Sequence, residues 1–277
     1  MATSSSKGSS KIDRLRRITS PQNALVKALR RAFLHSEVND EGLFAVEGSK
    51  NIEEAIRSGL VIHAVLFSES GAVRAERLLP QLGAKVETLL VEDEVFRSAV
   101  NTTSTQGAAA LVEAPRFTFE DCLRGSSSLI VVTEGIQDPG NLGTLFRSGE
   151  AFGASGVLLG EQTVSRFNAK VVRASAGSIF RLPCVEITLE DALSRLRAVE
   201  VRIVGTSSHK GKLLDKVDFT GSIAVVIGNE GAGLSREMLA QLDEVITISH
   251  SSKVESLNAG VAASVILYEA SRQRSLQ

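Results

Sequence analysis

Residues 223–235 read IAVVIGNEGAGLS, residues 244–252 read EVITISHSS, and residues 256–271 read SLNAGVAASVILYEAS. The β-branched runs at 223–227 and 245–248 predict two buried strands, because such side chains pack well in a sheet that is covered on both faces. Each run ends at once in a loop, the first rich in glycine and the second in serine. Loops that follow neighbouring strands can form one crevice, so this stretch predicts a binding site.

These two loops carry candidate functional residues. Three glycines within residues 228–233 let the backbone approach a ligand closely, because no Cβ is in the way. Their order fits neither a dinucleotide-binding fingerprint nor a Walker A loop. Glu230 is either a solvated turn residue or a group that orients a backbone or an arginine beside a ligand. Ser256 is the candidate N-cap of a helix that carries Leu257, and Asn258 is a further polar candidate in its first turn.

A third loop, QDPGNLGTLFR at residues 137–147, leads into another predicted helix. Asn141 is the expected N-cap. Gly143 and Arg147 are four residues apart and therefore share a helix face, where the missing side chain would leave room for a phosphate or a ribose. An ordinary N-cap followed by a surface arginine remains the alternative. Thr206, at the end of another predicted strand, adds a fourth loop to the same rim.

Alternating strands and helices predict two α/β domains. The second is a six-strand, mostly parallel sheet with strands at 129–133, 156–159, 182–186, 201–204, 223–227 and 245–248. The expected division of the chain is a disordered, basic, Ser-rich tail at 1–19, a small α/β sandwich at 20–113, a linker at 114–127 and the larger α/β domain at 128–277.

Composition excludes several classes of protein. The 277 residues are 43% hydrophobic and 23% charged, which is ordinary for a globular protein. No apolar run approaches the ~20 residues that cross a bilayer, and no apolar signal core begins the chain. Cys122 and Cys184 have no zinc-site or disulfide spacing. A reducing, cytoplasmic location without membrane or metal is therefore expected.

The charge is unevenly distributed along the chain. Residues 1–35 hold eight Lys or Arg against one Asp, although the whole chain has a net charge of −1. A basic segment on an otherwise acidic protein favours a polyanion partner such as a nucleic acid, because phosphate contacts supply much of the affinity for nucleic acids. A solvated tail that aids solubility is the equally open alternative.

Three motifs together resemble those of one family. N-x-G-x-x-x-R begins at Asn141, G-N-E-G-x-G begins at Gly228, and I-x-x-x-x-x-V-E-S-L-N-x-x-V-A-A begins at Ile248. In this order and across about 130 residues, they resemble the motifs of the SpoU (SPOUT) family of RNA ribose 2′-O-methyltransferases. The segment VVRASAG at 171–177 is also similar to the family. Residues 20–113 resemble the substrate-binding domain of the ribosomal RNA members, which is itself similar to kink-turn-binding ribosomal proteins.

The resemblance implies a homodimer with a trefoil-knotted methyltransferase domain that binds S-adenosylmethionine. It places the cofactor against Thr206, Gly228, Ile248 and Leu257. It places Asn141, Arg147, Glu230, Ser256 and Asn258 on the family's functional positions. The proline that usually follows the isoleucine of the third motif is Ser249 here, which would loosen that loop and weaken cofactor binding.

The chemistry that this implies is an in-line methyl transfer to a ribose hydroxyl, for which the protein positions and deprotonates the acceptor. No histidine lies at the matched motif positions, so Arg147 is the residue nearest to the chemistry. An arginine is a poor base because its pKa exceeds about 12. The preferred hypothesis is that Arg147 clamps the adjacent phosphate and polarises the 2′-OH, while Asn141 and Glu230 hold Arg147 and the loops. Ser256 and Asn258 are assigned to the loop and the ribose.

The expected function is therefore S-adenosylmethionine-dependent 2′-O-methylation of RNA, with large-subunit (23S) ribosomal RNA as the substrate. Transfer RNA is an alternative substrate of the same enzyme class. An RNA-binding protein of the same fold without turnover is a second alternative. A nucleotide-using dehydrogenase or kinase is a third, and the missing phosphate-loop fingerprints disfavour it.

Overall fold

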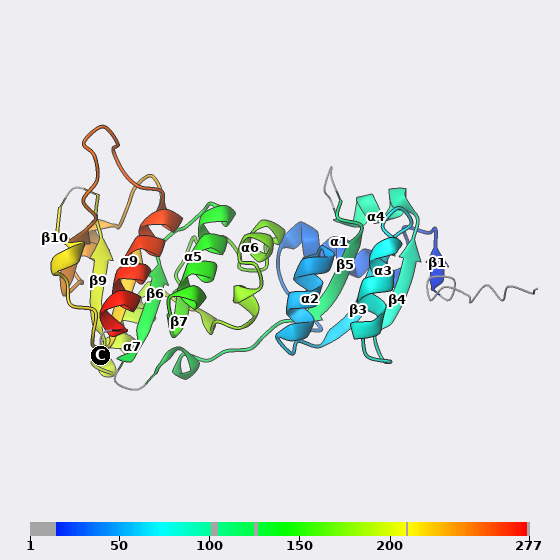
Figure 1. The fold of residues 1–277 in the computed structure, drawn as a ribbon, viewed down its shortest axis with the longest axis horizontal. Helices are drawn as coiled ribbons and strands as arrows, with labels where there is room; N and C mark the ends of the chain where they lie inside the picture. The colour runs from blue at the N-terminus through cyan, green and yellow to red at the C-terminus, as the bar shows by residue number, and fades with distance from the viewer. Residues whose placement is uncertain (1–14, 101–104, 125–126, 209, 276–277) are drawn as a thin grey trace, which may run out of the picture. The chain divides into compact units, whose positions relative to one another are not determined.

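The computed structural model describes residues 15–100, 105–124, 127–208 and 210–275. The chain divides into two compact units, Met1–Ala114 and Pro115–Gln277. Figure 1 shows the elements of each unit along the chain. Each unit is described by itself below.

The first unit is built on a five-stranded mixed sheet with the order β1-β4-β3-β5-β2. Strands β1, β4 and β3 are parallel to one another, and β5 runs antiparallel to both β3 and β2. The strands are β1 (Arg16–Ile18), β2 (Leu43–Glu47), β3 (Ile62–Ser68), β4 (Glu87–Val91) and β5 (Ala108–Glu113). The helices are α1 (Ala24–His35), α2 (Ser49–Arg57), α3 (Val73–Leu78) and α4 (Asp93–Val100), with a 3₁₀ turn at Leu79–Gln81.

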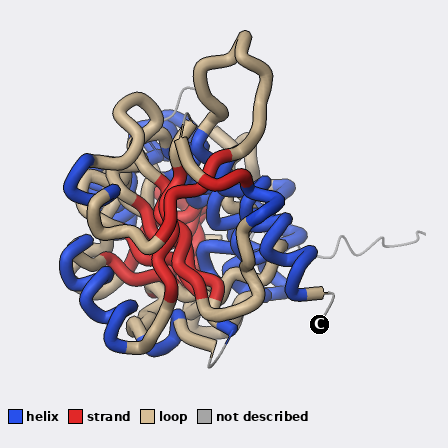
Figure 2. The backbone as a smooth tube through the Cα atoms, turned by 90° about the vertical axis from the view of Figure 1, so that its left-hand side faces the viewer, coloured by secondary structure: helices blue, strands red, loops and turns tan. Residues whose placement is uncertain are grey.

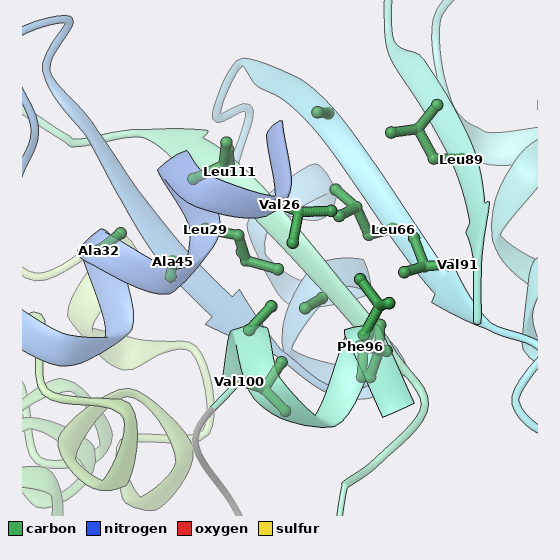
Figure 3. Packing of buried hydrophobic residues seen from close by; sticks show 14 of the residues in the cluster. Val26, Leu29, Ala32, Ala45, Leu66, Leu89, Val91, Phe96, Val100 and Leu111 are labelled. Atoms are coloured by element: carbon green, nitrogen blue, oxygen red, sulfur yellow. The ribbon is translucent and has the colours of Figure 1, made fainter. Parts of the chain in front are cut away.

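One hydrophobic core lies between this sheet and the helices α1 and α4 (Figure 3). Val26 and Leu29 of α1 and Phe96 of α4 are fully buried there against alternate residues of the strands, such as Leu66 and Leu111. Alternation along a strand directs the intervening side chains to the other face, which is why every residue of β2 is buried.

The predicted tail at 1–19 needs a correction at its end. Arg16–Ile18 forms the edge strand β1, with Arg16 paired to Leu89 and Ile18 to Val91. Three residues with two arginines give no apolar alternation, so the sequence carried no strand signal there. Residues 1–14 lie outside the described residues.

The second unit is built on a sheet of seven parallel strands with the order β10-β12-β9-β11-β6-β7-β8. Its strands are β6 (Leu129–Thr133), β7 (Gly156–Leu159), β8 (Cys184–Glu186), β9 (Arg202–Thr206), β10 (Lys212–Leu213), β11 (Ile223–Ile227) and β12 (Glu244–Thr247). The mostly parallel α/β architecture is as predicted. The strand β10 was missed because its two residues are both exposed and carry no pattern.

Helices cover both faces of this sheet (Figure 2). They are α5 (Pro139–Ala151), α6 (Ala169–Ala174), α7 (Leu189–Ala198), α8 (Arg236–Leu239) and α9 (Ala259–Arg274), with 3₁₀ turns at Glu120–Cys122, Ser178–Phe180 and Leu214–Lys216. Residues of α7 and α8 share one core with β6, β9 and β11, while α5 packs against α6 and α9. All residues of β6 and β11 are buried, which explains their continuous apolar sequences.

None of the helices in the described part of the chain is both long enough and apolar enough to span a bilayer.

Candidate active site

A cavity of about 460 Å³ lies beyond the carboxyl ends of β9, β11 and β12. All four residues predicted to hold a cofactor line it: Thr206, Gly228, Ile248 and Leu257. Glu230 and Ser256 line it as well, together with Ser207, Ser208, His250, Glu255 and residues of 227–234. The volume lies within the usual range for a small-molecule site.

The glycine-rich loop at 228–233 closes on itself. Asn229 and Gly233 exchange two backbone hydrogen bonds of 3.1 and 3.0 Å. A Cβ on Gly228 would lie 2.5 Å from the carbonyl carbon of Gly233, so only glycine allows this closure. At Gly233, by contrast, φ is +69° and a Cβ would meet no atom within 4 Å, so the backbone faces open space. The loop thus presents main chain to the cavity.

Asn229 was not singled out from the sequence, yet its side chain fixes this loop. Its Oδ1 accepts hydrogen bonds from the backbone N–H groups of Gly231 and Ala232, at 2.9 and 3.0 Å. Its Nδ2 donates to the carbonyl oxygen of Gly135, at 2.8 Å. The loop after β11 is therefore tied to the loop after β6. The signal for it was present as the asparagine that follows the first glycine of the G-N-E-G-x-G pattern.

Three residues of the separate motifs form one chain of hydrogen bonds. Asn258 Nδ2 donates to Asn141 Oδ1 at 2.7 Å, and Asn141 Nδ2 donates to Glu230 Oε1 at 2.9 Å. Asn141 is 6% exposed, so its amide is largely shielded from competing water. The bonds connect the start of α9, the start of α5 and the loop after β11. This triad of Asn258, Asn141 and Glu230 is the central polar feature of the site.

The carboxylate of Glu230 accepts two further hydrogen bonds, from the backbone N–H groups of Gln137 and Asp138 at 3.3 and 3.1 Å. Burial by itself would raise the pKa of Glu230. The hydrogen bonds from Asn141 and from backbone N–H groups outweigh burial and lower this pKa below its ordinary value of 4.5. Glu230 is therefore an ionised acceptor that joins two loops, although its side chain is exposed.

Two predicted helix caps are wrong. The N-cap of α5 is Asp138, whose Oδ1 accepts from the Asn141 N–H at 2.8 Å, and Pro139 occupies the first helical position. The N-cap of α9 is Asn258, whose Oδ1 accepts from the Val261 N–H at 3.1 Å. Ser256 precedes the cap and lies in the wall of the cavity.

The patch expected between Gly143 and Arg147 does not exist. A Cβ on Gly143 would lie 2.4 Å from the Cβ of Ala174, so this glycine serves the close packing of α5 on α6. Arg147 is exposed and does not line the cavity. Its side chain makes no hydrogen bond or ion pair with any residue that the structure describes. In particular, Asn141 and Glu230 bond to each other and not to Arg147.

A histidine does lie in the site. His250 lines the cavity, and its Nδ1 is 2.8 Å from the carbonyl oxygen of Ile248. This contact spans Ser249, the position where the family's usual proline is absent, and it constrains the turn there. Sequence reasoning passed over His250 because it compared only the matched motif positions.

The residues of the cavity fit S-adenosylmethionine. The main chain at 228–233 is open to close approach by an adenosine, and Thr206 and Ser207 offer hydroxyl groups. Glu230 and Glu255 place carboxylates in the wall of a site that would hold a positive sulfonium. Within the described residues, no cluster of three or more His, Cys, Asp or Glu side chains could hold a metal ion.

The fold and this site define an α/β methyltransferase, and comparison with known proteins specifies the family. Residues 128–268 match the SpoU rRNA Methylase family, and residues 23–110 match the MRM3-like substrate binding domain. The chain belongs to the SpoU rRNA methylase family. It is an S-adenosylmethionine-dependent RNA ribose 2′-O-methyltransferase, as its three motifs indicated.

Individual relatives agree with this assignment over nearly the whole chain. The 23S rRNA (guanosine(2553)-2′-O)-methyltransferase RlmP of Bacillus subtilis is 29% identical, covering 92% of this chain and 98% of the relative. The AdoMet complex of the SpoU methyltransferase AviRb from Streptomyces viridochromogenes has a TM-score of 0.79 at 28% identity. The match covers 92% of this chain and 99% of the AviRb chain. An AdoMet-bound rRNA methyltransferase from Sinorhizobium meliloti has a TM-score of 0.80 at 26% identity. The match covers 93% of this chain and 98% of the Sinorhizobium chain.

Glu230→Gln should change how stability depends on pH. Because the pKa of Glu230 is lower in the folded protein, its carboxylate stabilises the fold above its ordinary pKa of 4.5. That contribution is lost as the pH falls through the folded pKa. Thermal unfolding of the wild type and the variant should be compared between about pH 3 and pH 7. The difference between their melting temperatures should be largest near neutrality and should shrink toward acid pH. A difference that stays constant across this range would show that ionised Glu230 does not hold the loops.

Proposed function

We propose that this enzyme methylates the ribose 2′-OH of a nucleotide in 23S ribosomal RNA, in the cytoplasm where ribosomes are assembled. The observation that carries the proposal is the similarity to RlmP, whose name gives that RNA, across both units of the chain. A structure concerned with 2′-OH methylation of transfer RNA covers only 55% of this chain at a TM-score of 0.50. The rRNA methyltransferase from Sinorhizobium meliloti covers 93%. Ribosomal RNA is therefore favoured over transfer RNA.

We assign the chemistry to this chain's residues as follows. When bound, S-adenosylmethionine would supply a methyl group on a sulfonium, so that the O–CH3 bond to the ribose forms as the S–CH3 bond breaks and the neutral thioether leaves. Thr206, Gly228, Ile248 and Leu257 hold the cofactor. The triad of Asn258, Asn141 and Glu230 keeps the surrounding loops in one geometry, and Ser256 lies beside the ribose. Preorganisation of this kind lowers the barrier because the reacting atoms are already aligned.

Arg147 is assigned to the phosphate beside the target ribose. Its exposed guanidinium has no partner among the described residues, so its donors remain free for an incoming RNA. A bidentate contact would fix the phosphate, polarise the 2′-OH and let the hydroxyl proton pass to that phosphate or to water. Arg147 belongs to the same helix as Asn141, so the triad fixes its backbone rather than its side chain.

A homodimer is part of the proposal. Val261, Val265 and Tyr268 are 48%, 37% and 56% exposed and recur on α9 at helical spacing. Tyr268 packs edge-on against Phe152, directly after α5, so the stripe continues onto the helix that carries Arg147. A second copy of the chain would cover these apolar side chains and bring two Arg147 side chains to one shared face.

Arg147→Lys should lose at least about 100-fold in kcat, because a point charge cannot reproduce a planar two-donor contact. Binding of S-adenosylmethionine should be unchanged, since Arg147 does not line the cavity. Single-turnover transfer of a labelled methyl group, with Arg147→Ala as the reference for complete loss, measures the effect. Turnover near the wild-type rate in the lysine variant would refute the phosphate clamp.

The substrate can be tested by mapping 2′-O-methyl groups. Cells with and without the gene should differ at one nucleotide of 23S ribosomal RNA, and purified protein with S-adenosylmethionine should restore it. The guanosine equivalent to the RlmP target is the first position to examine. A difference confined to transfer RNA, or none in any RNA, would contradict the proposed substrate.

Val265→Asp should dissociate the dimer, because a buried, unpaired carboxylate is costly at an apolar contact. Light scattering after gel filtration should give twice the chain mass for the wild type and the single-chain mass for the variant. Val199→Asp is the matched control, since Val199 is 45% exposed at the end of α7. A monomeric wild type at assay concentrations would exclude the dimer.

A further inference from the structure

The helix α1 of the first unit turns a basic stripe to solvent. Its buried side consists of Val26, Leu29 and Ala32, which pack into the core (Figure 3). At 100° per residue, Lys27 and Arg31 lie on the opposite side of the helix, and Arg30 lies on the flank next to Val26. Lys27 and Arg31 are exposed and Arg30 is half-buried. Three cations thus occupy roughly 6 Å of helix length.

These charges are not neutralised within the unit. The helix α1 contains no Asp or Glu. The side chains of Lys27 and Arg31 have no hydrogen-bond or ion-pair partner in the described part of the chain. Arg30 donates to the carbonyl oxygen and the hydroxyl of Ser98, at 3.2 and 2.9 Å, and these neutral groups leave its charge uncompensated while holding it in place.

Two other arginines of the same unit are paired with acids. Arg57 of α2 bonds to Glu54 at 2.8 Å, and Arg77 of α3 bonds to the buried Glu53 at 2.7 Å. The stripe on α1 is also limited in extent, because exposed acids follow the helix at Glu37, Asp40 and Glu41. Its positive potential is therefore local rather than a property of the whole unit.

We propose that the stripe formed by Lys27, Arg30 and Arg31 is a docking surface for the phosphate backbone of the RNA substrate. The proposal rests on the proposed function and adds the face through which the substrate-binding unit holds RNA. Residues 23–110, which include all of α1, match a substrate-binding domain. A closely spaced set of cations that no acid neutralises complements a polyanion. Such contacts position the RNA without reading its sequence. An acidic protein surface would have the same charge, and the test separates the two.

The double variant Lys27→Gln, Arg31→Gln tests this surface in the full-length protein. The matched control is Arg74→Gln, Lys85→Gln, which removes the same charge from two other exposed positions of the unit. Binding of protein-free large-subunit ribosomal RNA is measured across a salt series. If each side chain neutralises one phosphate, the α1 variant loses about 1.4 to 1.8 from the slope of log K against log salt, and binds roughly 10- to 50-fold more weakly at about 0.1 M salt. The control should stay within about twofold of the wild type, because its side chains contact no phosphate.

Methyl transfer gives the second readout. The α1 variant should raise the KM for RNA by a similar factor and leave kcat at saturating RNA and S-adenosylmethionine binding unchanged. Equal effects of the α1 variant and the control, or an unchanged salt slope, would overturn the proposal. RNA affinity that the α1 substitutions leave unchanged would also overturn it, and would leave an acidic protein surface as the occupant of the stripe. A wild type that transfers no methyl group to any RNA would instead refute the proposed function, so the two failures can be told apart.

Discussion

The side-chain amide of Asn141 is the constraint on which the site depends. Its oxygen accepts from Asn258 and its nitrogen donates to Glu230, so a single planar group joins residues that are 117 and 89 positions away in the chain. Loops have no regular backbone pairing of their own. The conformational entropy that is lost when they become ordered must therefore be offset by bonds of this kind. Because both ends of the amide are used, neither neighbouring loop can move without breaking a bond to a buried side chain.

Close backbone approach makes these bonds possible. A Cβ on Gly260, in the first turn of α9, would lie 3.3 Å from the Cα of Asn141, so glycine lets α9 reach the start of α5. Gly143 does the same between α5 and α6. Glu230 then completes the arrangement, because its charge is stabilised by backbone donors at the amino end of α5, where the helix dipole also favours an anion. Packing thus comes first, and the polar network follows from it.

The central strands were predictable, while the links between the loops were not. The bounds of β6, β7 and β11 follow directly from the sequence, because strands that are buried on both faces read as short continuous apolar runs. The cap at Asp138 was also within reach, since Pro139 marks a first helical position. The pairing of Asn141 with Asn258 was not, because no local pattern encodes a contact between distant loops. For the same reason, the sequence left open whether Gly143 makes room for a ligand, when it serves helix packing.

The two units divide the task between them: the second builds the methyl-transfer site, and the first offers the surface that we assign to RNA. The central claim is that the triad shapes the cofactor cavity, although Asn141 itself does not line that cavity. Titration calorimetry of S-adenosylmethionine into wild type and Asn141→Ala tests this most directly. Loss of a hydrogen bond to a charged partner should weaken binding by roughly 10- to 100-fold. Equal affinity of the two proteins, or no heat with the wild type, would contradict it.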